Sequence, residues 1–193
     1  MKIDLAQGQV DAIQTALSEK VCIITGGPGV GKTAIIKALV MVFGKRGLCV
    51  MLAAPTGRAA KRMSEATGHE ASTIHRLLKY QPRTGEFEYG PHNQLEGNVF
   101  ILDETSMVDI DLMNSFLGAL PDTGCLIMVG DSDQLPSVGP GNVLRDMIDS
   151  GQIPCRKLDM IFRQEKGGWI VRNAHRINTG EMIESPQSDD DSD

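Results

Sequence analysis

A glycine-rich segment that ends in lysine and threonine, residues 26–33, could bind the phosphates of a nucleotide. Its sequence, GGPGVGKT, fits the phosphate-loop pattern G-x-x-x-x-G-K-[ST] at every fixed position. Glycines let successive backbone N–H groups converge on a phosphate, and a helix N-terminus adds partial positive charge. Lys32 would reach the β- and γ-phosphates, and the Thr33 hydroxyl would ligate Mg²⁺. The residues expected to contact the nucleotide are Gly27, Pro28, Gly29, Val30, Gly31, Lys32, Thr33 and Ala34.

Two adjacent carboxylates, Asp103 and Glu104, could complete this chemistry. Asp103 directly follows an apolar run and could help to hold Mg²⁺, usually through water, because Mg²⁺ keeps much of its hydration shell. Glu104 could orient or deprotonate an attacking water. An isolated Asp-Glu pair is most often a surface feature, but its place after a strand and a complete phosphate loop favours catalysis. Asp109 and Asp111 are weaker candidates that we expect to cap a helix or face solvent.

Two further polar side chains occupy comparable positions. Gln134 lies in the segment 130–136, which follows another apolar run, and it could bond a γ-phosphate. Arg163 lies in the segment Phe-Arg-Gln, 162–164. By themselves these segments would be interpreted as a turn and a surface arginine.

Apolar runs alternate with helical segments along the chain. Strands are expected at 21–25, 48–53, 99–102 and 125–129, with a fifth starting at 157–158. Helices are expected at 5–17, 34–43, 58–66, 109–120, 142–148 and 169–177. This alternation predicts an α/β fold in which a parallel sheet carries helices on both faces. Ligands of such folds bind at the carboxyl ends of the strands, where all the polar motifs fall.

Residues 80–97 have a different character, because glycine and proline punctuate a polar stretch. Thr84-Gly85 predicts the turn of a small hairpin that projects from the domain. Phe87 and Tyr89, two residues apart, would share one face of its strand. A mobile loop with incidental aromatic residues explains this stretch equally well.

Length and composition indicate one globular domain. The chain has 193 residues, of which 41% are hydrophobic and 23% are charged. Its net charge is −6, but much of the acidity lies in the final residues 189–193. A local basic strip matters more for nucleic-acid binding than the net charge does. The residues of that strip are Arg58, Lys61, Arg62, Arg76, Lys79 and Arg83.

Cysteine usage and hydropathy point to the cytoplasm. The four cysteines are widely spaced, and three of them lie in apolar, strand-like runs. This favours buried free thiols in a reducing compartment over disulfides or zinc. No apolar run approaches the roughly 18 residues that a membrane helix needs, and the first residues do not resemble a signal peptide. We therefore expect a cytoplasmic protein with no membrane partner.

Taken together, these segments resemble the early motifs of superfamily 1 helicases, in the same order. They are most similar to RecD-like ATP-dependent DNA helicases, the exodeoxyribonuclease V alpha subunit, whose near relatives include the conjugative relaxase-helicases. The resemblance runs from about Leu5 to Gly180. The matching segments are Gln9, 26–33, 54–60, 72–75, 103–107, 130–141, 162–164 and 173–180.

This resemblance implies ATP and Mg²⁺ as cofactors and a RecA-like phosphate-loop NTPase fold. Gln9 would recognise adenine, Gln134 would sense the γ-phosphate, and Arg163 would act as an arginine finger. Residues 80–97 fall where the family places a small subdomain with a strand-separating pin. Sequence-independent contacts to the DNA backbone are implied for Pro55, Thr56, Arg58, Thr73 and His75.

Such helicases need two RecA-like domains, and this sequence contains motifs of the first only. We therefore expect residues 1–180 to be the first motor domain, 80–97 its inserted hairpin, and 181–193 an acidic linker or tail. The expected function is ATP-driven translocation on single-stranded DNA, 5′-to-3′ as the family implies, with duplex unwinding. The expected partners are DNA, the second RecA-like domain of the full-length chain, and nuclease or recombination subunits. The alternative is a nucleotide-switch binding module or an RNA-directed motor.

Overall fold

Six strands form one parallel sheet in the computed structural model, which describes residues 5–158, 173, 176–177 and 180–183. Their order is β3-β2-β6-β7-β1-β8. The strands are β1 Val21–Gly26, β2 Val50–Ala54, β3 Ala71–Thr73, β6 Val99–Leu102, β7 Cys125–Gly130 and β8 Cys155–Leu158. The central strands β6 and β7 are almost continuously apolar and buried, as parallel strands covered on both faces must be. The predicted α/β class is confirmed.

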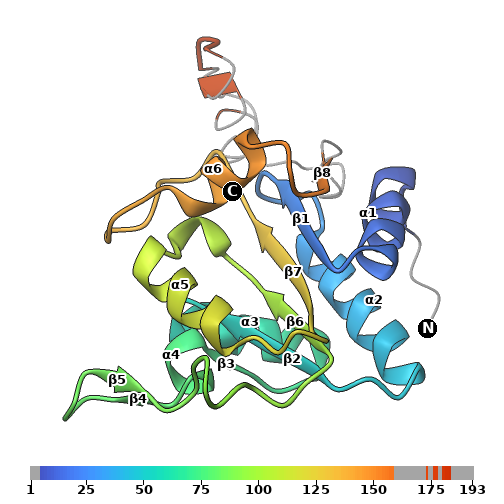
Figure 1. Cartoon of the computed structure of the whole chain (residues 1–193). Helices are drawn as coiled ribbons and strands as arrows, with labels where there is room; N and C mark the ends of the chain where they lie inside the picture. Colours follow the sequence, from blue (N-terminus) through green and yellow to red (C-terminus); the bar gives the residue numbers. More distant parts are fainter. Residues whose placement is uncertain (1–4, 159–172, 174–175, 178–179, 184–193) are drawn as a thin grey trace.

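Helices cover both faces of this sheet (Figure 1). On one face lie α1 Gln7–Ser18, α2 Lys32–Lys45 and α3 Gly57–Thr67. On the other lie α4 Ile74–Leu77, α5 Ile110–Ala119 and α6 Val143–Asp149. Three of these helices have an N-cap residue whose side chain accepts a hydrogen bond from a backbone N–H group in the first turn. These residues are Thr56 for α3, Thr73 for α4 and Asp109 for α5. Asp109 is therefore a helix cap, as its sequence position suggested.

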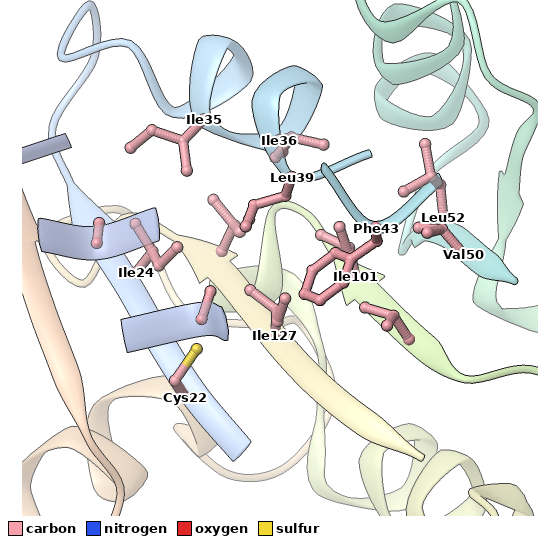
Figure 2. Close-up of a cluster of buried hydrophobic side chains, with 14 of the residues drawn as sticks. Cys22, Ile24, Ile35, Ile36, Leu39, Phe43, Val50, Leu52, Ile101 and Ile127 are labelled. Atoms are coloured by element: carbon pink, nitrogen blue, oxygen red, sulfur yellow. The ribbon is translucent and has the colours of Figure 1, made fainter. Parts of the chain in front are cut away.

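The two faces bury separate apolar clusters. In the first, Ile35, Ile36, Leu39 and Phe43 of α2 point onto strand residues such as Ile127, as Figure 2 shows. In the second, α5 packs on the opposite face. Phe116 of α5 meets Phe100 of β6 in an edge-to-face arrangement, with 6.2 Å between ring centroids. These two layers hold the strand ends in fixed relative positions.

A short antiparallel hairpin projects after α4. Its strands are β4 Tyr80–Gln81 and β5 Glu86–Phe87, and the N–H groups of Thr84 and Gly85 donate to the Gln81 carbonyl at the turn. Gly85 has a φ of 75°, a conformation that favours glycine. Phe87 and Tyr89 pack against the second cluster. The interpretation as a hairpin is therefore correct, and the aromatic residues are part of its attachment to the domain.

Some strand boundaries differ from expectation. The second strand begins at Val50 rather than at residue 48. The reason is that the Leu48 N–H donates a hydrogen bond to the Phe43 carbonyl at the end of α2, so Leu48 is not free to pair in the sheet. Strand β8 begins at Cys155, two residues before the expected start. The expected helix 169–177 lies almost wholly outside the described residues. Within the described ranges, no helix is both long and apolar enough to cross a membrane.

The cysteine prediction holds only in part. All four thiols are free, but only Cys22 is buried. Burial raises the pKa of the Cys22 thiol to about 12, which keeps it protonated and unreactive. Cys49 is exposed because it precedes β2 rather than lying within it, and its N–H donates to the Asn98 side chain. The expectation of a buried Cys49 is wrong.

Candidate functional site

The glycine-rich segment forms a tight loop between the end of β1 and the start of α2. Gly31 precedes the first residue of α2 and has a φ of 85°. Gly26 cannot carry a side chain, because a Cβ atom there would lie 2.8 Å from the Leu158 carbonyl oxygen. The loop therefore has the backbone shape that lets N–H groups face an anion at a helix N-terminus.

Lys32 and Thr33 begin the helix that follows this loop. The Lys32 ammonium donates hydrogen bonds to the carbonyls of Gly26 and Gly27, the latter at 3.0 Å. Its positive charge is thereby held over the loop where phosphates are expected. The Thr33 side chain is exposed in the first turn of α2, as a metal-binding hydroxyl must be.

Asp103 and Glu104 follow β6, which is separated from β1 by the single strand β7. Burial raises the pKa of Asp103 to about 6, although the hydrogen bond from the Glu104 N–H (2.9 Å) and the positive charge of Lys32 oppose this rise. Because β6, β7 and β1 run parallel, the loop and the carboxylate pair lie at the same edge of the sheet, one strand apart. The sequence predicted this association from strand ends alone.

Glu104 has the features of a functional carboxylate. Its φ is 52°, an uncommon value for a residue other than glycine. Its Oε2 atom is buried and has no hydrogen-bond partner among the described residues. A buried, unsatisfied carboxylate oxygen is costly unless a ligand or water completes it. The strain and the unpaired oxygen therefore both point to a functional position.

These residues fit a magnesium ion. Mg²⁺ prefers oxygen ligands, and in phosphoryl-transfer sites it is held by one or two carboxylates together with substrate phosphates. Asp103 and Thr33 supply such oxygens. Among the described residues, no cluster of three or more His, Cys, Asp or Glu side chains could hold a metal without help. The donor set suits an ion that arrives with a nucleotide.

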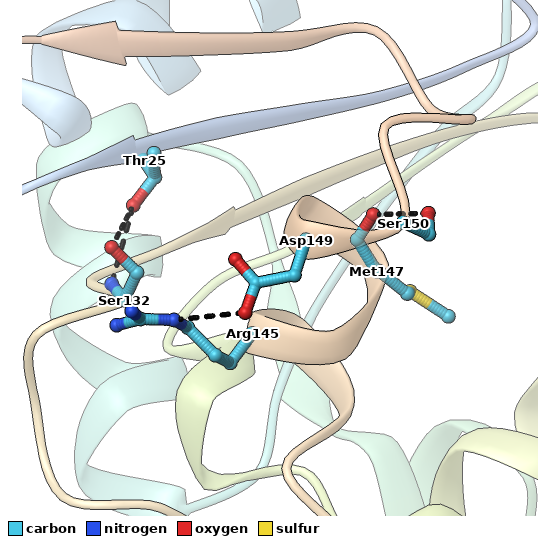
Figure 3. Close-up of polar contacts among 6 residues, drawn as sticks. All are labelled: Thr25, Ser132, Arg145, Met147, Asp149 and Ser150. Atoms are coloured by element: carbon cyan, nitrogen blue, oxygen red, sulfur yellow. Dashed lines mark hydrogen bonds and ion pairs between the residues drawn. The ribbon is translucent and has the colours of Figure 1, made fainter.

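The loop after β7 is fixed by side chains that the sequence reasoning missed. Figure 3 shows the Thr25 hydroxyl, at the end of β1, bonded to the Ser132 N–H (3.2 Å) and the Ser132 hydroxyl (3.3 Å). The turn is closed by the Asp133 N–H, which donates to the Asp131 carboxylate, and by the Gln134 N–H, which donates to the Asp131 carbonyl. The Gln134 side chain itself is exposed at this edge of the sheet.

Thr105 makes an equivalent link between β6 and β7. Its hydroxyl donates to the Val129 carbonyl at 2.7 Å and lies 3.3 Å from the Leu102 carbonyl. The loop that contains the carboxylates is thus bonded to β7, the strand that precedes the Gln134 loop. Thr25 and Thr105 each stand directly beside a motif, which is a sequence signal for their place near the site, but their partners depend on the order of the strands.

Gln9 contacts the phosphate loop directly. Its Nε2 donates to the Val30 carbonyl at 3.1 Å, its Oε1 accepts from the Ala6 N–H at 3.2 Å, and the residue is 4% exposed. The structure therefore brings this residue into the site that the sequence predicted. Recognition of adenine by Gln9 stays a prediction.

The residues predicted to contact a nucleic acid lie at or after the ends of two neighbouring strands. Pro55, Thr56 and Arg58 follow β2, while Thr73 is the last residue of β3 and His75 lies in the helix α4 that follows it. The Thr56 and Thr73 hydroxyls accept from the N–H groups of Ala59 and Arg76, both at 3.2 Å, so each is a helix cap. Arg58 and His75 are exposed.

The hairpin contacts one of these predicted DNA-contact residues, His75, through its aromatic side chains. The His75 ring lies 5.6 Å from the Tyr80 ring and 5.7 Å from the Phe87 ring, centroid to centroid. The basic strip also contains an ion pair, because Lys79 is bonded to Glu88 at 2.7 Å. Lys79 therefore contributes less positive charge than the sequence suggested. The predicted Arg163 lies outside the described residues.

A phosphate loop after one strand of a parallel sheet, with a carboxylate pair after the next strand but one, defines a RecA-like phosphate-loop NTPase domain. Comparison with known proteins agrees. Residues 9–140 match the family described as the AAA domain, and the chain belongs to that family.

Two relatives place the chain near RecD-type helicases. It is 38% identical over 180 residues to the ATP-dependent RecD2 DNA helicase of Deinococcus radiodurans, covering 92% of this chain and 24% of that protein. It is 38% identical over 162 residues to the RecBCD enzyme subunit RecD of Mycolicibacterium smegmatis, covering 72% of this chain and 29% of that subunit. The chain spans about a quarter of the length of these relatives. The predicted resemblance is confirmed.

A solved structure shares the fold. The Pif1 helicase from Candida albicans superposes with a TM-score of 0.70 at 22% identity, over 92% of this chain and 44% of that one. The predicted RecA-like architecture is confirmed.

Proposed function

We propose that this chain is the ATP-binding and ATP-hydrolysing motor domain of a RecD-like DNA helicase. It would translocate on single-stranded DNA in the 5′-to-3′ direction and unwind duplex DNA. The observation that carries this proposal is the association of Lys32, Asp103 and Glu104 at one end of the sheet. The names of two relatives, which specify an ATP-dependent DNA helicase and a RecBCD subunit, support it.

Each residue has a role that its chemistry supports. The loop N–H groups and the Lys32 ammonium bind the β- and γ-phosphates and offset their negative charge. Thr33 and Asp103 would hold Mg²⁺, which neutralises charge on the phosphates when it is bound. Glu104 has a buried oxygen without a partner, so it can accept a proton from the attacking water. Gln134 and Arg163 are proposed as the γ-phosphate sensor and the arginine finger.

The nucleic-acid partner is single-stranded DNA in this proposal. It would lie along Pro55, Thr56, Arg58, Thr73 and His75, with the hairpin 80–97 separating the strands. A second RecA-like domain of the same full-length chain would complete the motor, and nuclease or recombination subunits are proposed partners. The free thiols support a cytoplasmic location.

Glu104→Gln is the sharpest test of the chemistry, because it keeps the shape of the side chain and removes its basicity. Binding of Mg-ATP should persist while hydrolysis falls by roughly two orders of magnitude or more. Loss of nucleotide binding would instead make Glu104 a structural or metal-binding residue. Stimulation of hydrolysis by single-stranded DNA, compared with RNA of the same sequence, tests the choice of nucleic acid.

A further inference from the structure

The segment 88–95, which returns from the hairpin to the domain, is bonded to the C-terminal end of α5. The Leu95 N–H donates to the Ala119 carbonyl at 2.8 Å, and Gln94 Nε2 donates to the Leu120 carbonyl at 3.1 Å. Leu95 is 4% exposed and packs in the same apolar cluster as Ala119. The last carbonyls of a helix have no partner within the helix, so these two donors satisfy groups that the helix itself cannot.

A glycine in α5 makes room for this segment. A Cβ atom at Gly118 would lie 3.3 Å from Cγ and 3.4 Å from Cδ of Pro91. Glycine weakens a helix relative to alanine, and the close packing of Pro91 explains its place in the last turn of α5. Within the segment, Asn93 Nδ2 donates to the Glu88 carbonyl at 3.1 Å, which connects the anchored end to the residue after β5.

The N-terminal end of the same helix contacts the loop 130–141 that follows β7. The Ile110 N–H donates to the Pro140 carbonyl at 3.0 Å. A Cβ atom at Gly139 would collide with Oδ2 of Asp109, the residue that caps α5. The end of this loop therefore lies directly against the first turn of α5.

Helix α5 thus connects the loop that contains Gln134 with the base of the hairpin. Its ten residues span about 15 Å. Phe116 is fully buried and packs on Phe100 of β6, which fixes the helix on the sheet. Figure 1 shows α5 and the β4–β5 hairpin on the same side of the domain. The base of the hairpin therefore has a fixed place relative to the nucleotide site.

We infer that Gln94 is a positioning residue for strand separation, which holds the base of the hairpin on α5. This inference rests on the proposed function and deepens it, because it names the contact that anchors the proposed strand-separating element. A hairpin that separates strands must resist the duplex that translocation drives against it. A weaker anchor lets the hairpin yield, so fewer base pairs are separated for each ATP hydrolysed.

The test compares Gln94→Met with the wild type in the full-length protein that contains this domain. Methionine keeps the length of the side chain, removes the donor to the Leu120 carbonyl and adds no charge that DNA would sense. Hydrogen exchange of the Leu95 amide, followed by mass spectrometry, should become about fivefold faster, the effect of one lost hydrogen bond. The number of base pairs displaced per ATP hydrolysed should fall about two- to fivefold, at most the factor by which the anchor weakens.

Three further variants complete the comparison. Gln94→Lys restores a donor beside the C-terminal end of α5, where positive charge is favourable, and should keep the wild-type ratio of displacement to hydrolysis. Gly118→Leu displaces Pro91 while leaving Gln94 in place, and should lower this ratio as Gln94→Met does. Gln14→Met, the same substitution at an exposed glutamine of α1, should behave like the wild type.

The outcomes separate the inference from the proposed function. Unchanged exchange of the Leu95 amide in Gln94→Met, or faster exchange with an unchanged ratio of displacement to hydrolysis, would overturn the inference and leave the proposed function intact. A wild type that hydrolyses ATP without displacing DNA would overturn the proposed function and the inference together. Slow exchange of the amides in β1 and β7 establishes that each variant is folded.

Discussion

Thr25 and Ser132, which lie 107 residues apart in sequence, are hydrogen-bonded to each other at the carboxyl ends of adjacent strands. Thr25 is 2% exposed, and it precedes the phosphate loop. Ser132 is two residues before Gln134. Because the strands pair in parallel, this contact fastens the loop that binds phosphate to the loop that carries the predicted phosphate sensor.

Thr25→Val should therefore slow ATP hydrolysis more than it weakens nucleotide binding. Valine has the shape of threonine but cannot bond to Ser132, so the Gln134 loop loses its anchor. We expect turnover to fall about five- to tenfold, with Mg-ADP affinity within about twofold of the wild type. Thr25→Ser, which keeps the hydroxyl, should turn over normally. An equal loss of binding and turnover in Thr25→Val would mean that the contact only maintains the phosphate loop.

Lys32→Ala should abolish ATP turnover without unfolding the domain. The Lys32 ammonium donates to the Gly26 and Gly27 carbonyls in part-buried contacts, and its side chain belongs to neither apolar cluster, so its removal leaves the core intact. Alanine has no positive charge to offset the negative charge of the β- and γ-phosphates, so hydrolysis should stop. The matched control is Lys45→Ala in the last turn of the same helix, which should hydrolyse ATP like the wild type. A folded Lys32→Ala variant with normal turnover would remove this residue from the mechanism.

The raised pKa of Asp103 predicts a pH-dependent stability. The folded state holds a proton up to about pH 6, whereas the ordinary value for this carboxyl is 3.8. The folded state therefore binds more protons between these values, and this residue makes stability fall as pH rises through that window. Above it, the buried charge costs about 2–3 kcal/mol.

Asp103→Asn should accordingly be more stable than the wild type at pH 7.5, without Mg²⁺ or nucleotide. Asparagine can still accept the hydrogen bond from the Glu104 N–H. The difference in unfolding free energy, measured by urea denaturation, should vanish below about pH 4, where both side chains are neutral. A variant that is less stable than the wild type at pH 7.5 contradicts the assignment of a destabilising buried charge.

Arg58→Ala should weaken binding to single-stranded DNA evenly across sequences. Arg58 is exposed after β2, where it can contact a phosphate without reading a base. We expect the slope of log affinity against log salt concentration to decrease by about one. Lys45→Ala, in the last turn of α2 and outside the predicted DNA-contact residues, serves as the control. A change in base preference at an unchanged salt slope would place Arg58 elsewhere in the interface.

The role of the hairpin in unwinding is best tested by a change confined to its turn. Removing the tip 83–92 would take away Phe87 and Tyr89, which pack against the core. Replacing residues 82–85 by Asn-Gly instead keeps both strands and supplies a favoured two-residue turn. In the full-length protein this change should spare DNA-stimulated ATPase activity and impair unwinding. Equal loss of both activities would make the hairpin a structural element only.

Much of the architecture was accessible from local sequence. Apolar runs bounded by glycine and polar residues located the central strands, and the phosphate loop located the site. The contacts of Thr25, Thr105 and Gln9 were not accessible, because they depend on which strands are neighbours and on the register between them. Sequence periodicity contains no information on strand order. The exposure of Cys49 was missed for a related reason. The hydrogen bond from the Leu48 N–H to the Phe43 carbonyl keeps Leu48 at the end of α2, so β2 begins only at Val50 and Cys49 lies before it.

The most direct test of the central claim is strand displacement by the full-length protein that contains this domain, on forked DNA with either a 5′ or a 3′ single-stranded tail. The account predicts ATP-dependent displacement from the 5′-tailed fork only, and none in the Lys32→Ala variant. ATP hydrolysis without displacement of either fork, or displacement that survives Lys32→Ala, would contradict the assignment of this chain as a RecD-like DNA motor.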